Sequence, residues 1–372
     1  MGKEYDVAVL GGSAAGYALA CTLAADGRNV IVLEFPAGAA ESPLGDWVPG
    51  NFFRTNHLPP KLPQACRAVP FTKVCYHDAG LKRQAVQRFR GAAGYLLDSG
   101  RLRGALRDLA KRAGVECRGA RAAPAIALEE QRVVLGAPAW VVARMLVIAQ
   151  GQPQEAVSAL GLPVRSLPRS NLAVAALDVP VRGRTGAPAL AGGLNVAEMK
   201  DPGDLGMFFL VGGVLHLRAI SASPEPRPRA AELSAMLTGL RQAGLVPDSL
   251  ELGRARGALW RPPAGVALEL DVHVAKRCLL IGSAGGFVEP LTGQTLMPTV
   301  RSAVLVAQTL RQALRGEAPQ ETLMQFKTAW RESLAESLRP PNASLRMLLP
   351  LLFVNRQILA RFTEALLHGG QI

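Results

Sequence analysis

The segment from Tyr5 to Glu34 constrains the fold of this chain more than any other part of its sequence. Residues 7–10 form a short, entirely apolar run, which is typical of a parallel strand buried on both faces. A glycine turn follows, then a helix of small residues over 17–25 and a second apolar strand over 30–33. A strand, a glycine turn, a helix, a strand and an acid about 20 residues after the turn together predict a dinucleotide-binding βαβ unit.

Each position of the glycine turn has an expected role. Gly11 permits the tight turn, and Gly16 lets the helix pack closely against the strand. The N–H groups at the helix start suit a pyrophosphate, and Glu34 can accept hydrogen bonds from the adenosine ribose while disfavouring a 2′-phosphate. Ser13 stands where a second glycine is usual, so we expect its side chain to point away from the phosphates or to donate to them. The predicted contacts are Gly11, Gly12, Ser13, Ala14, Ala15, Gly16 and Glu34.

Composition excludes several other classes of protein. The chain has 372 residues, enough for one large or two interlocked domains, and it contains no uncharged apolar run of 18 residues that would span a membrane. No signal peptide is expected before the first strand, and the five cysteines lack the spacing of a metal site, so we expect free thiols, no bound metal and a cytoplasmic protein. The net charge of +13 comes mostly from arginine, without the aromatic-interleaved basic stripe of a nucleic-acid binder.

The middle of the chain predicts an antiparallel sheet inserted into the α/β framework. Residues 35–65 are rich in Pro, Gly and Asn and are expected to form a long irregular loop. The runs 69–77 and 84–89 predict a hairpin. Residues 171–221 contain several strand-like runs with little helix between them, and residues 253–263 are expected to lead back to the dinucleotide domain.

A second glycine-rich anchor spans residues 277–310. A buried strand over 278–281 meets a glycine turn, then Pro290 to Gly293, then a long helix from about Met297. This arrangement again aims backbone N–H groups at the start of a helix toward a polar part of a ligand.

The first fingerprint, a strand ending in AQG and the run GSAGGFVEPLTGQTL together resemble the p-hydroxybenzoate-hydroxylase-like FAD superfamily, nearest its geranylgeranyl-reductase and flavin-halogenase-like branch. The resemblance covers residues 1–320. It implies FAD with its adenosine end at the first glycine turn, and its ribityl chain and isoalloxazine edge at the second anchor. The 171–221 sheet would then cover the flavin and form the substrate pocket. The further cofactor contacts implied are Arg101, Gln150, Gly282, Ser283, Pro290, Gly293, Gln294, Thr295 and Leu296.

The resemblance implies a mixed α/β fold, in which a Rossmann-like FAD-binding domain carries an inserted antiparallel-sheet substrate domain and a helical C-terminal cap. The expected FAD-binding domain comprises 1–68, 92–168 and 254–320, the substrate domain 69–91 and 169–253, and the cap 321–372.

Several cofactor positions depart from the family pattern. The aspartates and glutamate of the family are replaced by Ser283, Gln150 and Gln294, its arginine by Ser99 with Arg101 nearby, and a glycine by Thr295. A hydrogen bond to a charged acceptor contributes about 1.5–3 kcal/mol against about 1 kcal/mol for a neutral one, so we expect weakened FAD binding. The alternative is a non-catalytic relative that has lost FAD and binds a lipid-like ligand or a partner protein.

No residue stands out as the catalytic acid, base or thiol. The candidates by location are Asp46, His57, Cys75, His77 and His216. Neither the WxWxIP stretch of the halogenases nor the YxWxFP stretch of archaeal reductases is present, so the resemblance leaves both reduction of an isoprenoid double bond and monooxygenation of an aromatic or polyketide compound open.

The C-terminal segment after Pro340 is dense in apolar residues interleaved with Arg346, Arg356 and Arg361. It predicts a helical cap over the substrate pocket, a dimer interface, or contact with a membrane surface. Each reading favours a hydrophobic small-molecule substrate. NAD(P)H is the expected electron donor, and a carrier protein or a second copy of the chain is an alternative partner.

Overall fold

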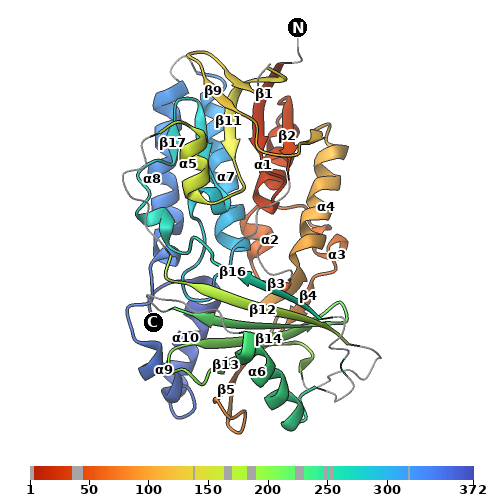
Figure 1. Ribbon diagram of the computed structural model, residues 1–372, viewed down its shortest axis with the longest axis vertical. Helices are drawn as coiled ribbons and strands as arrows, with labels where there is room; N and C mark the ends of the chain where they lie inside the picture. The colour runs from red at the N-terminus through yellow and green to blue at the C-terminus, as the bar shows by residue number, and fades with distance from the viewer. Residues whose placement is uncertain are drawn as a thin grey trace.

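The computed structural model places two lobes end to end along the long axis of the molecule (Figure 1). It describes residues 4–35, 45–136, 139–162, 170–181, 190–222, 230–246, 250, 255–316 and 319–372. The N-terminus lies at the far end of the first lobe, and the C-terminus lies near the junction with the second (Figure 1).

The first lobe is built on an eight-stranded sheet in the order β17-β18-β11-β1-β2-β8, with the hairpin β9-β10 added to β11. Strand β1 lies between β2 and β11 and is parallel to both, so the chain reverses its direction of travel across the sheet at β1. These strands are β1 (Glu4–Leu10), β2 (Val30–Glu34), β8 (Glu116–Gly119), β9 (Ile126–Leu128), β10 (Val133–Leu135), β11 (Val141–Ile148), β17 (Val274–Ala275) and β18 (Cys278–Leu280).

Both faces of this sheet are buried along its centre, which explains the continuous apolar runs at 7–10, 30–33 and 145–148 in its central strands. Val7 and Val9 point to one face, where four helices cover them, and Ala8 and Leu10 point to the other. The helices of the first face are α1 (Ala14–Ala25), α4 (Ser99–Arg112), α7 (Leu296–Ala313) and α8 (Pro319–Leu338), and the second face carries α5 (Pro153–Ala159).

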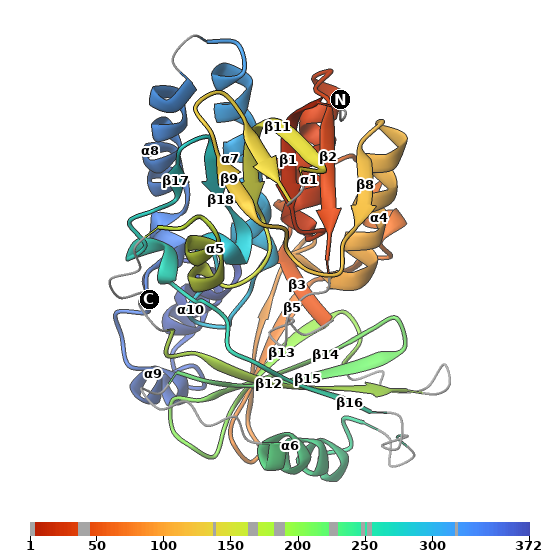
Figure 2. The same ribbon diagram turned by 45° about the horizontal axis from the view of Figure 1, so that its top comes forward.

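The second lobe is a seven-stranded sheet in the order β16-β12-β15-β14-β13-β5-β6. It is antiparallel except for the parallel pair β13–β5. Helix α6 (Ala230–Gln242) covers one face, and the other faces the first lobe (Figure 2). The strands are β5 (Lys73–His77), β6 (Gln84–Arg88), β12 (Ala173–Pro180), β13 (Gly193–Glu198), β14 (Leu205–Val211), β15 (Val214–Ser221) and β16 (Arg256–Trp260).

A small sheet lies at the junction of the lobes. Its order is β3-β7-β4, with both pairs antiparallel. Its strands are β3 (Gly45–Pro49), β4 (Val69–Phe71) and β7 (Gly94–Asp98), and the short helices α2 (Phe52–Thr55) and α3 (Leu62–Ala65) lie between β3 and β4. Every residue of β3 is buried, so this strand forms part of the contact between the lobes.

The C-terminal helices complete the second lobe. Helix α9 (Leu345–Leu351) precedes α10 (Arg356–His368), whose apolar side joins the core on the inner face of the seven-stranded sheet. The mixed α/β fold and helical C-terminal region expected from the sequence are therefore confirmed. Among the helices of the described residues, none combines the length and apolar character that crossing a bilayer requires.

Three details of the sequence analysis need correction. The expected loop 35–65 contains β3, α2 and α3 over its described part, 45–65. Residues 256–260, assigned to the FAD-binding domain, form β16, which pairs with β12 at the edge of the substrate sheet. Residues 69–71 pair with β7 in the small sheet rather than joining the substrate domain. The positions of β3, β4 and β16 are decided by pairing with strands that are distant in sequence. Local sequence patterns do not contain this information.

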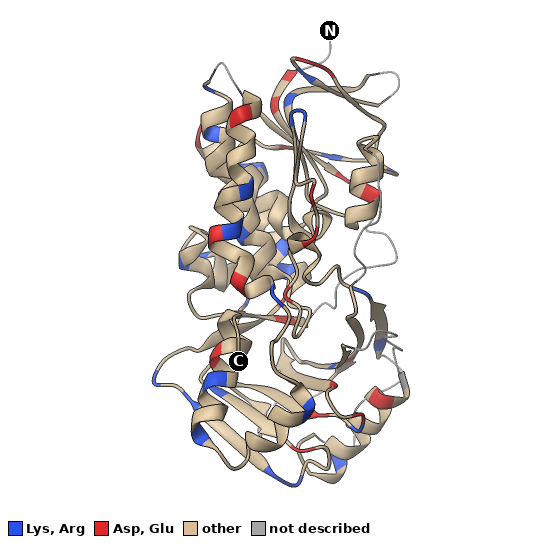
Figure 3. Ribbon diagram, turned by 90° about the vertical axis from the view of Figure 1, so that its left-hand side faces the viewer, with Lys and Arg blue, Asp and Glu red and all other residues tan. Residues whose placement is uncertain are grey.

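Basic and acidic segments are interspersed along the helices of both lobes (Figure 3).

Candidate cofactor site and the cluster between the lobes

The carboxyl ends of β1, β11 and β18 bring the two glycine-rich anchors together. A side chain on Gly11, whose φ is +111°, would overlap Cβ of Gln150, which follows β11. A Cβ on Gly282, which follows β18, would lie 3.1 Å from the carbonyl oxygen of Ala149 and 3.6 Å from Cβ of Ala15. The edge formed by carboxyl ends, at the point where strand order reverses, is where open α/β sheets bind ligands.

Ser13 caps helix α1 instead of facing outward. Its hydroxyl donates to the carbonyl oxygen of Ala149 over 2.9 Å and accepts from the N–H of Gly16 over 3.1 Å. Among the described residues, the N–H groups of Ala14 and Ala15 have no protein acceptor. These two donors at the start of the helix are therefore the ones left for a phosphate.

Glu34 is already hydrogen-bonded within the protein. Its Oε1 accepts from the hydroxyl of Tyr17 over 2.7 Å and from Nε of Arg107 over 2.6 Å, and its Oε2 accepts from Nη2 of Arg107 over 2.7 Å. Arg107 is the main cause of the lowered pKa of Glu34, while burial and then Glu34 raise the pKa of Tyr17. One acceptor position on Oε2 remains for a ribose hydroxyl.

Tyr17 also crosses the glycine turn. Its hydroxyl oxygen lies 2.6 Å from the position that a Cβ of Gly12 would take, so a glycine at that position makes room for the phenol ring. Sequence reasoning missed both Tyr17 and Arg107. The structure places the predicted Arg101 elsewhere, on the exposed side of α4, where its Nη2 lies 3.6 Å from the Cβ position of Gly212 in the turn between β14 and β15.

The second anchor is a rigid turn. The carboxylate of Glu289 accepts from the N–H of Leu291 over 2.6 Å and from the N–H and hydroxyl of Thr292 over 2.8 and 2.7 Å. Burial raises the pKa of Glu289, and these donors oppose the rise. Gly293, with φ of +71°, packs against the substrate sheet, since its Cβ would lie 3.1 Å from the side chain of Leu172. The predicted contact Ser283 is half-buried in the 3-10 turn Gly282–Gly285 after β18, Pro290 is half-buried within the second turn, and Leu296 is the first residue of α7.

Gln294 and Thr295 join the second anchor to β3. The Nε2 of Gln294 donates to the carbonyl oxygen of Trp47 over 2.9 Å, and its Oε1 accepts from the N–H of Met297 over 3.4 Å. The hydroxyl of Thr295 donates to Oδ2 of Asp46 over 3.5 Å. One N–H at the start of α7 is therefore satisfied by the chain's own glutamine.

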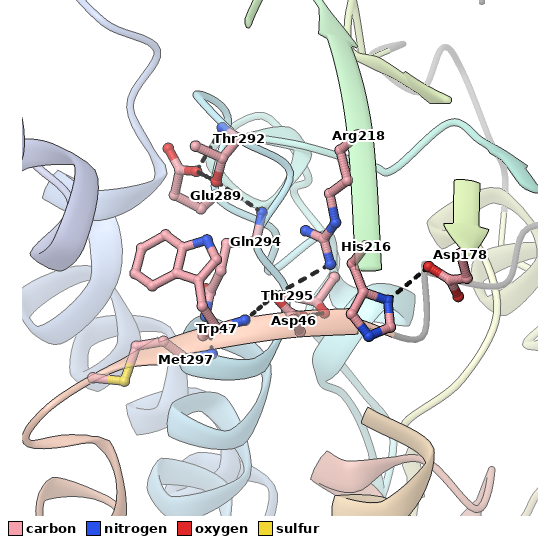
Figure 4. Close-up of polar contacts among 10 residues, drawn as sticks. All are labelled: Asp46, Trp47, Asp178, His216, Arg218, Glu289, Thr292, Gln294, Thr295 and Met297. Carbon is pink, nitrogen blue, oxygen red and sulfur yellow. Dashed lines mark hydrogen bonds and ion pairs between the residues drawn. The ribbon is translucent and has the colours of Figure 1, made fainter. Parts of the chain in front are cut away.

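A group of buried polar residues lies where β3, β12 and β15 meet (Figure 4). We call Asp46, Trp47, Asp178, His216 and Arg218 the interlobe cluster. Nδ1 of His216 lies 2.7 Å from Oδ1 of Asp178, and Nη2 of Arg218 lies 3.6 Å from Oδ1 of Asp46. Burial raises the pKa of Asp46, and the charge of Arg218 partly offsets this. Of the sequence candidates for catalysis, Asp46 and His216 are in this cluster, and Asp178 and Arg218 were missed.

The remaining candidates lie away from the interlobe cluster. His57 is exposed in a turn. His77 is buried, its Nε2 lies 3.1 Å from Oδ1 of Asn195, and burial lowers its pKa. The ring of His77 lies 5.3 Å from the ring of Phe208 at a tilt of 42°, and Phe208 belongs to the core on the α6 side of the sheet. Cys75 is buried in β5, and burial raises the pKa of its thiol.

Neither a family model nor a curated protein matches this sequence. Solved structures do match the fold. A geranylgeranyl bacteriochlorophyll reductase-like protein from Thermoplasma acidophilum aligns with a TM-score of 0.77 at 15% identity, over 99% of this chain and 97% of the other. The p-nitrophenol 4-monooxygenase of Pseudomonas putida gives 0.68 at 16% identity, over 98% and 94%. The flavin-dependent brominase Bmp2 gives 0.67 at 13% identity, over 97% and 90%.

This chain therefore shares its fold with a reductase-like protein, a monooxygenase and a flavin-dependent brominase. The superfamily resemblance read from the two glycine-rich anchors is thereby confirmed at the level of the fold, and the departures at single positions remain as the sequence has them.

The residues at the carboxyl edge fit the adenosine diphosphate part of FAD. Gly11 and Gly16 permit the close turn, Ala14 and Ala15 offer free N–H groups, and Oε2 of Glu34 keeps one acceptor position. Fewer acceptor positions remain for the ribose than the sequence suggests, because Tyr17 and Arg107 already donate hydrogen bonds to the Glu34 carboxylate.

Proposed function

We propose that this protein is an FAD-dependent oxidoreductase that acts on a hydrophobic small molecule. The observation that carries the proposal is the convergence of the two glycine-rich anchors at the carboxyl edge of the sheet, facing a second lobe whose inner surface is mostly apolar. The fold shared with a flavin-dependent brominase and with a probable FAD-dependent monooxygenase supports it.

The residues that would hold FAD follow from the site. The N–H groups of Ala14 and Ala15 would bind the pyrophosphate, Glu34 the ribose, and Ser283 with the turn at Gly293 the ribityl side. When bound, FAD supplies hydride or oxygen chemistry. NAD(P)H is the proposed electron donor.

The substrate side would be formed by the inner face of the seven-stranded sheet. Val174, Phe209, Ile220 and Trp260 would contribute its apolar lining, and apolar side chains of α10 belong to the same core. The interlobe cluster gives this lining its polar groups. A small number of polar groups in a mostly apolar cavity orient a ligand, which fits an isoprenoid or polyketide-like substrate.

Reduction of a double bond and monooxygenation are both supported by structural neighbours, one named as a reductase-like protein and one as a monooxygenase. A test is to load the protein with FAD and to follow reduction of the flavin by NADH or NADPH. Reoxidation of the reduced flavin is then followed both without oxygen and in air. A geranylgeranyl lipid that accelerates anaerobic reoxidation supports reduction. A phenol that accelerates NAD(P)H oxidation and is recovered hydroxylated supports monooxygenation. FAD-loaded protein unaffected by both classes would contradict the proposal.

The alternative from the sequence, a non-catalytic relative, has one observation in its favour. Ser13 and Gln294 satisfy helix-start N–H groups themselves, and Tyr17 and Arg107 occupy most of Glu34. That alternative requires protein that takes up lipid-like ligands but no FAD.

A further inference from the structure

Arg218 is a buried cation with unused hydrogen-bond donors. Its side chain is 2% exposed, and its Nε and Nη2 donate no hydrogen bond to any residue that the structure describes. Burying a charged group without hydrogen-bond partners is costly, and buried polar groups in native proteins are almost always paired. The guanidinium therefore has room for an acceptor that the described residues do not supply.

The neighbours of Arg218 do not fill this role. Asp46 lies 3.6 Å from Nη2, too far for a hydrogen bond, and its oxygens accept instead from the N–H of Trp47 and the hydroxyl of Thr295. His216, the neighbouring polar residue on the same face of β15, is paired with Asp178. The ring of Phe209 lies 5.9 Å from the guanidinium carbon, which is a cation–π contact with no acceptor oxygen.

The residues around Arg218 indicate what kind of ligand would carry the acceptor oxygen. Arg218 projects from β15 on the same face as Ile220, into the apolar core between the lobes (Figure 4). The indole N–H of Trp47 in the same cluster is also buried, and no described residue accepts a hydrogen bond from it. A ligand that satisfies this environment has an apolar body and at least one acceptor oxygen, and a negative charge on that oxygen complements the guanidinium.

We propose that Arg218 binds an anionic oxygen, a carboxylate or a phenolate, of the hydrophobic ligand. This rests on the proposed function only in treating that ligand as the substrate. An oxygen of the flavin ring offers related chemistry, so the experiment includes an arm for FAD. A planar, forked guanidinium distinguishes this group from a lysine, because it can hold both oxygens of a carboxylate.

The test is calorimetric titration of the full-length protein with decanoate and with the neutral decanamide. We expect decanoate to bind about tenfold or more tightly than decanamide, because hydrogen bonds to a charged group contribute about 1.5–3 kcal/mol. Arg218→Met should abolish that preference while keeping decanamide binding. Arg103→Met, an exposed arginine of α4, is the matched control and should behave as wild type.

Two outcomes would overturn the proposal. Equal affinity of the wild-type protein for the two probes is one, and it is readable even if Arg218→Met fails to fold. The other is an Arg218→Met protein that loses FAD affinity but keeps its preference for decanoate, which would assign the guanidinium to the cofactor. Failure of the protein to bind FAD at all would count against the proposed function while leaving the carboxylate result intact.

A separate observation concerns the C-terminal helices. Met347, Leu351 and Val354 in and after α9 are 73%, 40% and 71% exposed, although all three are apolar. Between Glu336 and Glu364 the sequence contains no acidic residue and four arginines, Arg339, Arg346, Arg356 and Arg361. Arg83 adds a further cation, stacked 5.1 Å from the ring centre of Phe353.

We infer that this tip contacts a lipid surface with anionic headgroups. Arg339 is paired with Glu336, and Arg346, Arg356 and Arg361 remain beside these apolar side chains in the sequence. Exposed apolar side chains with such cations suit an anionic bilayer, whereas two copies of this surface would repel each other. The test is sedimentation with vesicles of phosphatidylcholine alone or mixed with phosphatidylglycerol. Wild-type protein should sediment with the mixed vesicles, and Met347→Glu/Val354→Glu protein should not. Equal sedimentation of the two proteins, or none with mixed vesicles, would overturn the inference.

Discussion

The hydroxyl of Tyr17 donates to Oε1 of Glu34 over 2.7 Å, and this contact occupies an acceptor position that the dinucleotide fingerprint assigns to the ribose. In the sequence, Glu34 reads as a free acceptor for the adenosine ribose. In the structure, Tyr17 and Arg107 use three of its acceptor positions. The protein therefore keeps the fingerprint, but the ribose can make fewer hydrogen bonds to Glu34.

Removing the Tyr17 hydroxyl should strengthen binding of the adenosine diphosphate unit. Tyr17→Phe frees an acceptor position on Glu34, and one added hydrogen bond of about 1 kcal/mol corresponds to about fivefold in affinity. Titration with ADP and FAD measures it. Tyr5→Phe is the control, because Tyr5 donates to Glu116 on β8 and should leave ADP affinity unchanged. Weaker ADP binding by Tyr17→Phe would instead make the hydroxyl a ligand contact.

The pair of Arg107 and Glu34 should give stability a defined pH dependence. The pKa of Glu34 is lowered in the folded protein, so the stabilisation is present above the pKa of the unfolded chain, about 4.3, and is lost as pH falls through the folded-state pKa. Arg107→Met should cost about 0.5–1 kcal/mol of unfolding free energy at neutral pH, given its partial exposure.

Denaturant unfolding of wild type and Arg107→Met at neutral pH and below pH 4 measures this difference, which should shrink in acid. Arg132→Met, which breaks the exposed pair with Glu129, should have a smaller effect at neutral pH. A difference that stays constant with pH would mean that Arg107 stabilises through packing alone.

Gly11 should be indispensable for reasons of space and conformation together. An alanine there would have φ of +111° and would overlap Gln150, so we predict a loss of more than about 2 kcal/mol. Gly27→Ala is the matched control, since its φ is +76° with open space around it, and it should cost about 1 kcal/mol. Thermal or denaturant unfolding compares them, and equal losses would show that crowding at Gln150 is relieved without cost.

The hydrogen bond from Gln294 to the carbonyl oxygen of Trp47 should stabilise the contact between the second anchor and β3. Gln294→Ala leaves the buried carbonyl oxygen of Trp47 without its donor and should cost about 2 kcal/mol in unfolding free energy. Gln371→Ala removes an exposed hydrogen bond to the carbonyl of Pro340 and should be nearly neutral. If the two variants unfold at the same denaturant concentration, Gln294 does not hold β3 in place.

The parts of the fold that were predictable are those in which neighbouring residues determine the structure. The first βαβ unit, the β5–β6 hairpin and α7 follow from apolar periodicity and turn residues. Strand β3 did not, because its Gly and Pro resemble a loop and its pairing with β7 is distant in sequence. The edge strand β16 is mostly exposed, so no buried run marked it.

The glycines of the candidate site were predictable from the sequence, but the side chains that contact Glu34 and Asp46 were not. Gly11 and Gly282 mark close approaches of backbone and were identified correctly as turn positions. Arg107 lies 73 residues from Glu34, and Thr295 lies 249 residues from Asp46. Contacts at such separations depend on how the lobes pack, and no local motif records them.

The measurement that tests the account most directly is the visible absorption spectrum of the purified protein after incubation with FAD and desalting. Flavin absorbance should stay with the wild-type protein, and Tyr17→Phe should retain at least as much. A colourless protein from both variants, with normal folding, would contradict the assignment of the carboxyl edge as an FAD site.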